Sequence, residues 1–513
     1  MRYKVIGPPG TGKTRRLLNE LQKYVKRGIP LNRIGYFAFT RKAAGEARER
    51  YLDVETHLTK KDIPYFQTLH SLAFNTLGLK EENVMQELNY KRIGEECAIQ
   101  IKYASYETNS WNGIFSSNSE YLNLINLSQV RQSSPLEELD RNEHLGKIER
   151  SKLEAIAKEI EDYKDFHKLI DFTDMLDKFL RKGESPKFDA IFIDEAQDLS
   201  LIQWKIIDKI EKETGCDVWV AGDDDQAIFG WAGADVNSFI NWKAKEIPLQ
   251  QSERVPSEIQ IKALRIIDRV QDNRLKKDYF PKKEMGEILL QFKLSAIDMT
   301  KGDWLILTRT NALLQPIPRY LKSQGLFFET TKGNSIGKTL FEDIGYWNQI
   351  RKGEKIPEIQ EQRVLERMSK RDDKLEWYDA FDQVAPSTKD YLRSMLANGE
   401  DLSKTPRIKV STIHGAKGGE ATNVVLFLNQ TLNTMKAAKK SVAKQDEEYR
   451  VWYVAVTRAI KKLYLIKCNN RNKEFIYERI QKTNRRISLQ RHGNPTQSVY
   501  KQEQVAFRRG KCY

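Results

Sequence analysis

The sequence predicts an α/β protein with two parallel-sheet cores, each interrupted by a mostly helical insertion. In the first quarter, short apolar strands alternate with helical stretches, such as residues 33–39 followed by residues 40–51. Such alternation is typical of a parallel sheet covered by helices on both faces. The same pattern returns in residues 188–222 and again in residues 304–308 and 409–467. A glycine-rich octet that follows the first apolar run fits a turn from a strand into a helix.

Two polar, charge-rich segments without clear strands separate these α/β stretches. A chain of 513 residues is too long for one hydrophobic core and should divide into several domains. We expect a first core in residues 1–80 and 169–250 with a helical insertion in 81–168, a second core in 251–332 and 407–468 with a reduced helical insertion in 333–406, and a basic tail in 469–513.

The chain carries a formal net charge of +15, which favours a polyanionic partner. Residues 469–513 hold eleven Lys and Arg against three Asp and Glu, so more than half of the excess lies in the tail. The four cysteines are far apart and form no C-x-x-C pair, which argues against a metal site or a disulfide framework. No apolar run approaches the roughly 18 residues needed to cross a bilayer. We expect a cytoplasmic protein, or a viral or phage protein acting in its host's cytoplasm, that is not secreted and does not enter a membrane.

The octet GPPGTGKT is a complete phosphate-binding loop between an apolar strand and a helix. Glycines allow backbone N–H groups to turn towards phosphate oxygens, and the helix N-terminus favours negative charge. Lys13 would reach the β- and γ-phosphates, and the Thr14 hydroxyl would bind Mg²⁺. The expected nucleotide-binding residues here are Gly7, Pro8, Gly10, Thr11, Gly12, Lys13 and Thr14.

Two further polar groups follow apolar strands. Asp194 and Glu195 come directly after one of them, at the edge where ligands bind in such sheets. Asp194 would hold Mg²⁺, and Glu195 would orient and deprotonate the attacking water. Gln226 follows the next strand and could sense the γ-phosphate. Trp231 comes soon after it, in a loop from which an aromatic ring could stack on a base, although a core position is the commoner use of tryptophan.

Ten motifs together resemble those of superfamily 1 helicases of the UvrD/Rep/PcrA type, in that family's order. They are GPPGTGKT, FTRKAAGEARER, FQTLHSLA, LIDFTDML, IDEAQD, VAGDDDQAIFGWAGA, SERVPSE, TRTNA, STIHGAKGGEATNVV and EEYRVWYVAVTRA. The resemblance extends from residue 6 to about residue 467, outside the two helical segments. It implies two RecA-like cores that share one ATP with Mg²⁺, and 3′→5′ movement along single-stranded DNA up to duplex junctions. A monomer is expected in isolation, and the sequence does not indicate protein partners.

The resemblance also implies roles for individual residues. Arg254 and Arg458 would approach the γ-phosphate from the second core, and Glu420 would contact the ribose. Either arginine could instead form a surface ion pair. The implied DNA-contacting residues are Phe39, Thr40, Arg41, Thr68, His70, Phe229, Trp231, Thr412 and His414.

The chain departs from the family pattern at four points. Ala232 follows Trp231 where the family often has arginine, so one polar contact is missing. Glu253 replaces an aromatic residue that packs on adenine, and the chain begins too late for the N-terminal glutamine motif that reads adenine, so strict adenine selectivity is not implied. The second insertion is shorter than in the bacterial relatives. A translocase that remodels protein–DNA complexes or junctions without efficient unwinding is therefore one alternative. A DNA-binding scaffold with a silent ATPase is an alternative of another class.

Overall fold

The computed structural model describes residues 1–106, 115–142 and 148–476. Residues Met1–Tyr477 form one compact unit that contains two large β-sheets. In the described part of the chain, no helix combines the length and the apolar character needed to cross a membrane.

The first sheet has six strands, all parallel, in the order β3-β2-β6-β7-β1-β8. The carboxyl ends of β1, β6 and β7 therefore meet at one edge, which carries the glycine-rich loop and the segments after Asp194 and Gly222. The strands are β1 (Arg2–Ile6), β2 (Ile34–Ala38), β3 (Phe66–Gln67), β6 (Ala190–Asp194), β7 (Asp217–Gly222) and β8 (Lys245–Pro248).

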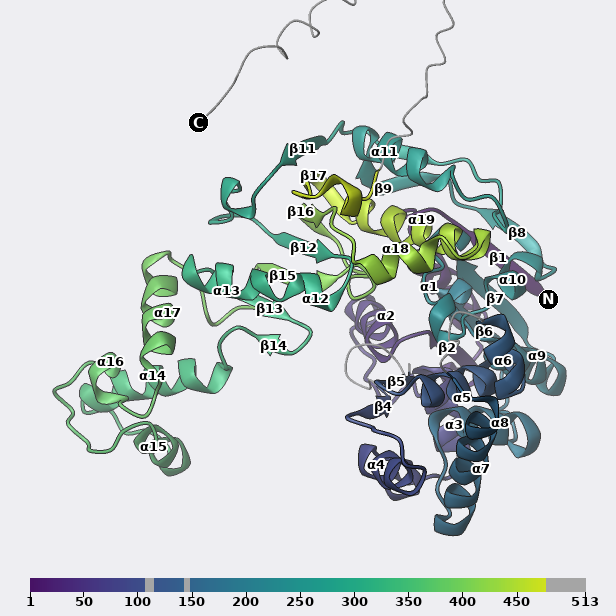
Figure 1. Ribbon diagram of the computed structural model, residues 1–513, viewed down its shortest axis with the longest axis horizontal. Helices are drawn as coiled ribbons and strands as arrows, with labels where there is room; N and C mark the ends of the chain where they lie inside the picture. Colours follow the sequence, from purple (N-terminus) through teal and green to yellow (C-terminus); the bar gives the residue numbers. More distant parts are fainter. Residues whose placement is uncertain (107–114, 143–147, 477–513) are drawn as a thin grey trace, which may run out of the picture. The chain divides into compact units, whose positions relative to one another are not determined.

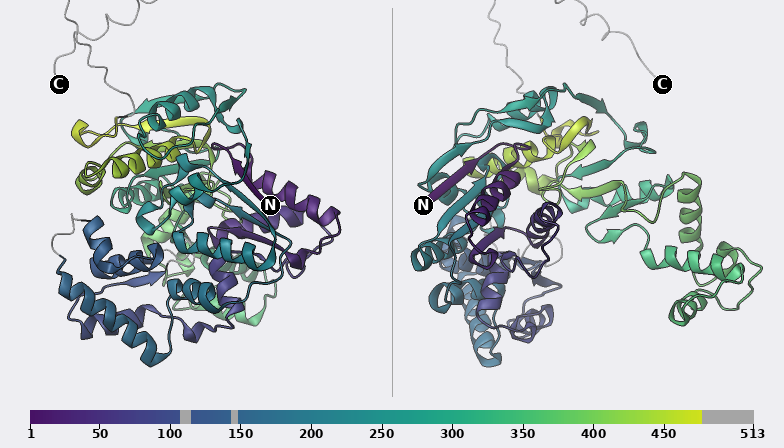
Figure 2. Two further views of the ribbon diagram at one scale, coloured as in Figure 1. Left: turned by 90° about the vertical axis from the view of Figure 1, so that its right-hand side faces the viewer. Right: turned by 180° about the vertical axis from the view of Figure 1, so that it is seen from behind.

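Helices cover both faces of this sheet because its strands are apolar on both sides (Figures 1 and 2). Along β2, Tyr36 packs with α1 and α2, whereas its neighbour Phe37 packs with helices on the opposite face. One face is covered by α1 (Lys13–Lys26) and α2 (Arg41–Val54), and the other by α3 (Leu69–Thr76), α8 (Phe172–Lys182), α9 (Leu201–Thr214) and α10 (Val236–Asn241).

The segment between α3 and α8 has a hydrophobic cluster of its own, formed around Tyr90, Leu122, Leu153 and Ile160. A short antiparallel hairpin, β4 (Ala104–Tyr106) with β5 (Phe115–Ser117), accompanies its helices, and the sequence did not predict it. The helices are α4 (Glu87–Glu96), α5 (Glu120–Arg131), α6 (Pro135–Arg141) and α7 (Arg150–His167).

The second sheet has seven strands in the order β11-β17-β16-β12-β15-β13-β14, parallel except for the β13–β14 pair. Helices α11 (Ser257–Ile267) and α19 (Val442–Val456) pack on one face, and α13 (Pro316–Ser323) on the other. The two parallel α/β cores predicted from the sequence are thus confirmed. The strands are β11 (Glu287–Gln291), β12 (Trp304–Thr308), β13 (Phe328–Thr330), β14 (Gly333–Asn334), β15 (Ile408–Thr412), β16 (Ala421–Phe427) and β17 (Ala459–Ile466).

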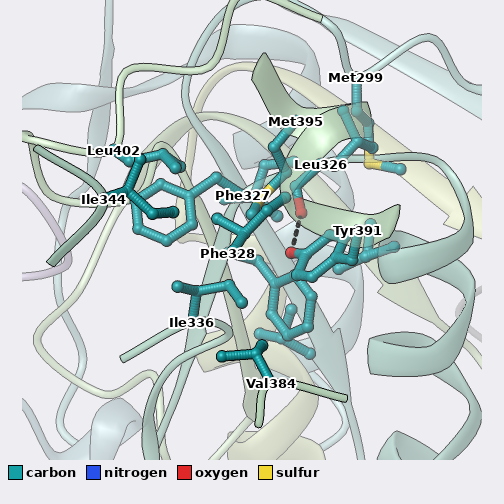
Figure 3. Packing of buried hydrophobic residues seen from close by; sticks show 14 of the residues in the cluster. Met299, Leu326, Phe327, Phe328, Ile336, Ile344, Val384, Tyr391, Met395 and Leu402 are labelled. Atoms are coloured by element: carbon teal, nitrogen blue, oxygen red, sulfur yellow. Dashed lines mark hydrogen bonds between the residues drawn. The ribbon is translucent and has the colours of Figure 1, made fainter. Parts of the chain in front are cut away.

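The second insertion shares one hydrophobic core with this sheet, unlike the first insertion. Figure 3 shows Phe328 of β13 among Ile344, Val384 and Met395 of the insertion. The Tyr391 hydroxyl donates a hydrogen bond of 2.5 Å to the Leu326 carbonyl across this junction. The insertion contains α14 (Lys338–Arg351), α15 (Glu358–Leu365), α16 (Trp377–Ala380) and α17 (Pro386–Ala397).

Smaller elements complete the second core. Strands β9 (Gln251–Pro256) and β10 (Phe280–Lys282) form a separate parallel pair. In the sequence, α12 (Asn311–Leu314) follows β12 and α18 (Leu432–Ala438) follows β16. The start of the predicted tail belongs to this core, because Phe475 stacks on Trp452 with ring centroids 4.3 Å apart. The rest of the predicted tail lies outside the described residues.

Candidate functional site

The glycine-rich loop connects β1 to α1, as the motif requires. Gly10 and Gly12 have φ of 77° and 79°, in the left-handed region that favours glycine. A Cβ atom on Gly10 would also lie 2.4 Å from the Cβ of Arg254, so the second core approaches the loop closely here. Within the loop, Lys13 Nζ donates to the Gly7 carbonyl at 2.8 Å. The ammonium group therefore lies against the loop backbone.

Asp194, at the end of β6, faces the start of α1. Its Oδ2 accepts hydrogen bonds from Thr14 Oγ1 at 2.6 Å and from the Tyr36 hydroxyl at 2.9 Å. Burial and the neighbouring Glu195 raise the pKa of Asp194. Burial would raise the pKa of Glu195, but Lys417, Lys13 and a hydrogen bond from Gln197 outweigh it and lower this pKa. The site therefore holds Glu195 as a carboxylate, the form that a general base requires.

Thr14 and Asp194 fit a magnesium site in the chemistry of their donor atoms. Both present oxygen atoms, which Mg²⁺ prefers, and the two oxygens lie 2.6 Å apart next to the phosphate loop. Mg²⁺ usually keeps several waters and takes further ligands from phosphates, so two protein oxygens are enough.

Arg458, which follows α19, joins the two cores. Its Nη2 donates to Gln226 Oε1 at 2.8 Å, and its Nε donates to the Val454 carbonyl at 2.9 Å. The side chain is 1% exposed, and burial together with the nearby Arg254 lowers the pKa of Arg458 to about 10. Arg458 is thus a buried cation beside Gln226 and not a surface ion pair.

The segment around β9 brings the second core onto the phosphate loop. Ser252 Oγ donates to the Pro9 carbonyl at 2.9 Å, and the Glu253 amide donates to the Gly10 carbonyl at 2.9 Å. Arg254 forms an ion pair with Glu420, so the two residues for which the resemblance implied nucleotide contacts here contact each other. The exposed Glu253 carboxylate pairs with Arg15 at the start of α1.

Sequence reasoning assigned no role to Lys417, although it lies inside one of the matching motifs. Its Nζ donates to Asp198 Oδ1 at 2.6 Å and to the Gln226 carbonyl at 2.5 Å, and it lies 5.1 Å from the centre of the Phe229 ring. Asp198 and Lys417 are 219 residues apart, and both side chains are buried. Only its motif position could have drawn attention to Lys417, because spacing along the chain gives no sign of this pairing.

A cavity of about 1880 Å³ lies beside this site and is lined by residues of both cores. Four of the predicted DNA-contacting residues line it, namely Phe229, Trp231, Thr412 and His414. Trp231 is 45% exposed, whereas Phe229 is 3% exposed and packs against Phe39 with ring centroids 5.4 Å apart. Trp231 therefore offers a ring surface to the cavity, while most of Phe229 is covered by protein.

The other predicted DNA-contacting residues lie on the first core. Phe39 and His70 line a small separate cavity of about 30 Å³. Thr40 and Thr68 accept hydrogen bonds from backbone amides as N-caps of α2 and α3, and Arg41 is the first residue of α2. Burial is the main cause that lowers the pKa of His70 to about 4, so this imidazole is neutral at pH 7.

Comparison with known proteins agrees with the motifs over nearly the whole described chain. Residues 2–246 match the model of the UvrD/REP helicase N-terminal domain, and residues 237–470 match that of the UvrD-like helicase C-terminal domain. The chain is 26% identical to the ATP-dependent DNA helicase Rep of Buchnera aphidicola over 257 residues, which are 47% of this chain and 36% of that protein.

Two other relatives are similarly distant. DNA helicase II of Haemophilus influenzae is 26% identical over 301 residues, 56% of this chain and 41% of the relative. A protein of Mycoplasma pneumoniae named as a probable DNA helicase is 23% identical over 494 residues, 92% of this chain and 82% of the relative. The chain thus spans less than half of the first two relatives. With both family domains matched in order, the chain belongs to the UvrD/Rep family of helicases.

Proposed function

We propose that this protein hydrolyses ATP to move 3′→5′ along single-stranded DNA and to separate duplex DNA at junctions. The cross-core hydrogen bond from Arg458 to Gln226 carries the proposal. The guanidinium of Arg458 is a second-core cation, and it is also close enough to Glu195 to contribute to lowering the pKa of that carboxyl. Positive groups on opposite sides of a transferring phosphoryl group stabilise the charge that develops during its transfer.

The residues would divide the chemistry as follows. Lys13 would bind the β- and γ-phosphates after leaving the Gly7 carbonyl, and Glu195 would orient the attacking water and accept its proton. Thr14 and Asp194 would hold Mg²⁺, which neutralises phosphate charge when it is bound. Arg458 and Arg254 would contact the γ-phosphate, which requires Arg254 to release Glu420.

The cavity next to the nucleotide site is the proposed path of the DNA strand. Trp231 would stack on a base, and Thr412 and His414 would contact the strand from the second core. Because ATP would contact both cores, its binding favours their closure, and hydrolysis removes that link. The grip on DNA at the shared cavity would change with each cycle, which produces stepping.

The variant Glu195→Gln tests the chemical step. We expect ATP turnover to fall by at least about 100-fold, because the amide cannot accept the proton, while nucleotide binding is retained. Steady-state hydrolysis with single-stranded DNA and equilibrium binding of a fluorescent nucleotide measure the two effects. The exposed Glu49→Gln serves as the matched control and should behave as wild type. Unchanged turnover in Glu195→Gln would remove this residue from its role.

Two alternatives are separated by activity assays on the wild-type protein. A translocase without efficient unwinding would show DNA-stimulated hydrolysis and movement along a single strand, but no separation of a tailed duplex. A scaffold with a silent ATPase would bind DNA and hydrolyse neither ATP nor GTP. Comparing ATP with GTP also tests base selectivity. Glu253 stands where the family has an aromatic residue that packs on adenine, and here its carboxylate pairs with Arg15.

A further inference from the structure

Three consecutive aspartates follow β7, and their side chains are buried. Asp223, Asp224 and Asp225 are at most 2% exposed. Buried carboxylates are unfavourable unless they are paired and hydrogen-bonded. Lys277 pairs with all three carboxylates. Its Nζ lies 2.9 Å from Asp223 Oδ1 and 3.0 Å from Asp225 Oδ2, and it contacts Asp224 more closely.

Lys277 belongs to a segment that we call the strap, residues 270–279 between α11 and β10. The strap reaches the first core through Lys277, through Arg274 Nε on Asp225 Oδ1 at 2.9 Å, and through the Tyr279 hydroxyl on the Pro9 carbonyl at 3.1 Å. None of the motifs that resemble the helicase family includes this segment.

The other side of the strap is held by α19 of the second core. Asp446 accepts hydrogen bonds from the backbone amides of residues 271 and 272, at 3.0 and 2.9 Å. Arg450 Nη2 donates to the Asn273 carbonyl at 2.7 Å. The same helix leads directly into Arg458. The strap is thus fixed to the element that delivers the arginine.

Asp223 connects Lys277 to the nucleotide site. Its Oδ1 accepts from Lys277, and its Oδ2 accepts from Gln226 Nε2 at 2.8 Å. An amide that points its nitrogen at Asp223 must present its oxygen on the other side, where Arg458 Nη2 lies at 2.8 Å. Lys277 is the chief positive group that lowers the pKa of Asp223 against the effect of burial, which keeps this carboxylate an acceptor.

We infer that Lys277 is a positioning residue for triphosphate hydrolysis: through Asp223 it sets the orientation of the Gln226 amide, and thereby the position of Arg458. The inference rests on the proposed ATP hydrolysis. Lys277 would act through these contacts with the aspartates and not by contacting the nucleotide. Its loss would free the Gln226 amide to rotate, and an amide nitrogen turned towards Arg458 would repel the guanidinium.

The test compares Lys277→Gln with Arg274→Gln in the full-length protein. Both variants remove one cation from the aspartate cluster, but Arg274 contacts Asp225 and not Asp223. We expect Lys277→Gln to lower kcat by about tenfold to a hundredfold with KM for ATP within about threefold, which is less than the loss of a directly contacting donor. Lys277→Arg, which restores a cation, should recover part of the loss, and Arg274→Gln should keep kcat near wild type.

A double variant covers the case in which Lys277→Gln folds poorly. Lys277→Gln with Asp223→Asn removes the charge of Asp223 together with the cation that pairs with it. The double variant should lose no more kcat than Asp223→Asn alone, because both residues act along one chain of contacts. Equal kcat losses in Lys277→Gln and Arg274→Gln, or additive losses in the double variant, would overturn the inference. ATP hydrolysis by the wild-type protein is the separate test of the proposed function, which a wild type without turnover would contradict. If the wild type is active and Lys277→Gln has the same kcat, only the inference about Lys277 is contradicted.

Discussion

The two halves of the nucleotide site are held in place in different ways. In the first core, the important side chains are bound by their own core: Lys13 donates to Gly7, and Thr14 and Tyr36 donate to Asp194. In the second core, Lys417 is held by Asp198 of the first core, and Arg458 donates both to Val454 of its own core and to Gln226 of the first core. The first half is therefore a local structure, whereas the second half is completed by contact between the cores.

This difference separates binding from turnover. A strand, loop and helix that form within one core can bind phosphate whether or not the other core has closed. Cations that depend on the partner core for their position act only when the cores are together. Binding should therefore follow the first-core residues, and the rate of hydrolysis should follow the second-core residues.

The largest expected effect comes from breaking the second half alone. We expect Arg458→Ala to lower kcat by about 10³-fold or more, because it removes a cation that stabilises the transferring phosphoryl group. Nucleotide binding should change by less than about tenfold, since uniform binding by the first core is kept. Steady-state kinetics and fluorescent-nucleotide binding provide the two measurements.

The matched comparison is Lys13→Ala, which breaks the first half. It should lose nucleotide binding itself, because Lys13 contacts the phosphates in the ground state as well as in the transition state. If Lys13→Ala and Arg458→Ala lost binding to the same extent, the distinction between the two halves would be wrong.

The first half of the nucleotide site was also the easier one to predict from the sequence. The glycine-rich octet and the strands before it and before Asp194 are local patterns, and the strand expected at residues 33–39 is β2 (Ile34–Ala38). Very short strands such as β3 and β14 leave too few residues for an alternating pattern, and they were not predicted.

Pairings between the cores could not be predicted because they join residues far apart in the chain. Lys417 meets Asp198 across 219 residues, and Lys277 meets Asp223 across 54. Arg458 was assigned only through the family resemblance, and its hydrogen bond to Gln226 is a property of the folded chain. Burial and charge balance of this kind depend on the tertiary contacts that a local pattern does not contain.

The next prediction concerns stability and its dependence on pH, and it involves Asp198, which pairs with Lys417 across the two cores. Burial raises the pKa of Asp198 to about 7, even though Lys417 favours the charged form. In the unfolded chain the carboxyl loses its proton near pH 4, so between pH 4 and 7 the folded state binds more protons and the group costs stability as pH rises. We expect Asp198→Asn to gain about 2–4 kcal/mol of stability relative to wild type between pH 4 and 8.

Thermal or urea unfolding of both proteins across this pH range measures the difference. Only the slope with pH is predicted, because the substitution also removes the ion pair to Lys417 at every pH. Asp208→Asn, at an exposed carboxylate on α9, is the control and should run parallel to wild type. A constant difference between Asp198→Asn and wild type would show that Asp198 does not titrate in this range.

The smallest expected effect extends the comparison to the cavity beside the nucleotide. The backbone amide of Trp231 donates to Glu447 Oε1 of the second core at 3.2 Å, so this first-core loop too is held across the cores. Trp231→Ala should weaken binding of single-stranded DNA by about 1–3 kcal/mol, the range for loss of one stacked base, without lowering the melting temperature. Fluorescence anisotropy with a labelled oligonucleotide at fixed salt measures it.

Phe229→Ala separates stacking from packing within the same loop. Phe229 is 3% exposed among Phe39, His414 and Lys417, so its truncation should destabilise the protein by about 3–5 kcal/mol as a core cavity would. Trp231→Ala should thus lower DNA affinity, whereas Phe229→Ala should lower the stability of the protein. Both variants would be compared at a temperature where both are folded. Equal loss of DNA affinity would then mean that Phe229 becomes exposed when the strand binds. In that case the cores must separate and break the contacts of Trp231 with Glu447 and of Lys417 with Asp198.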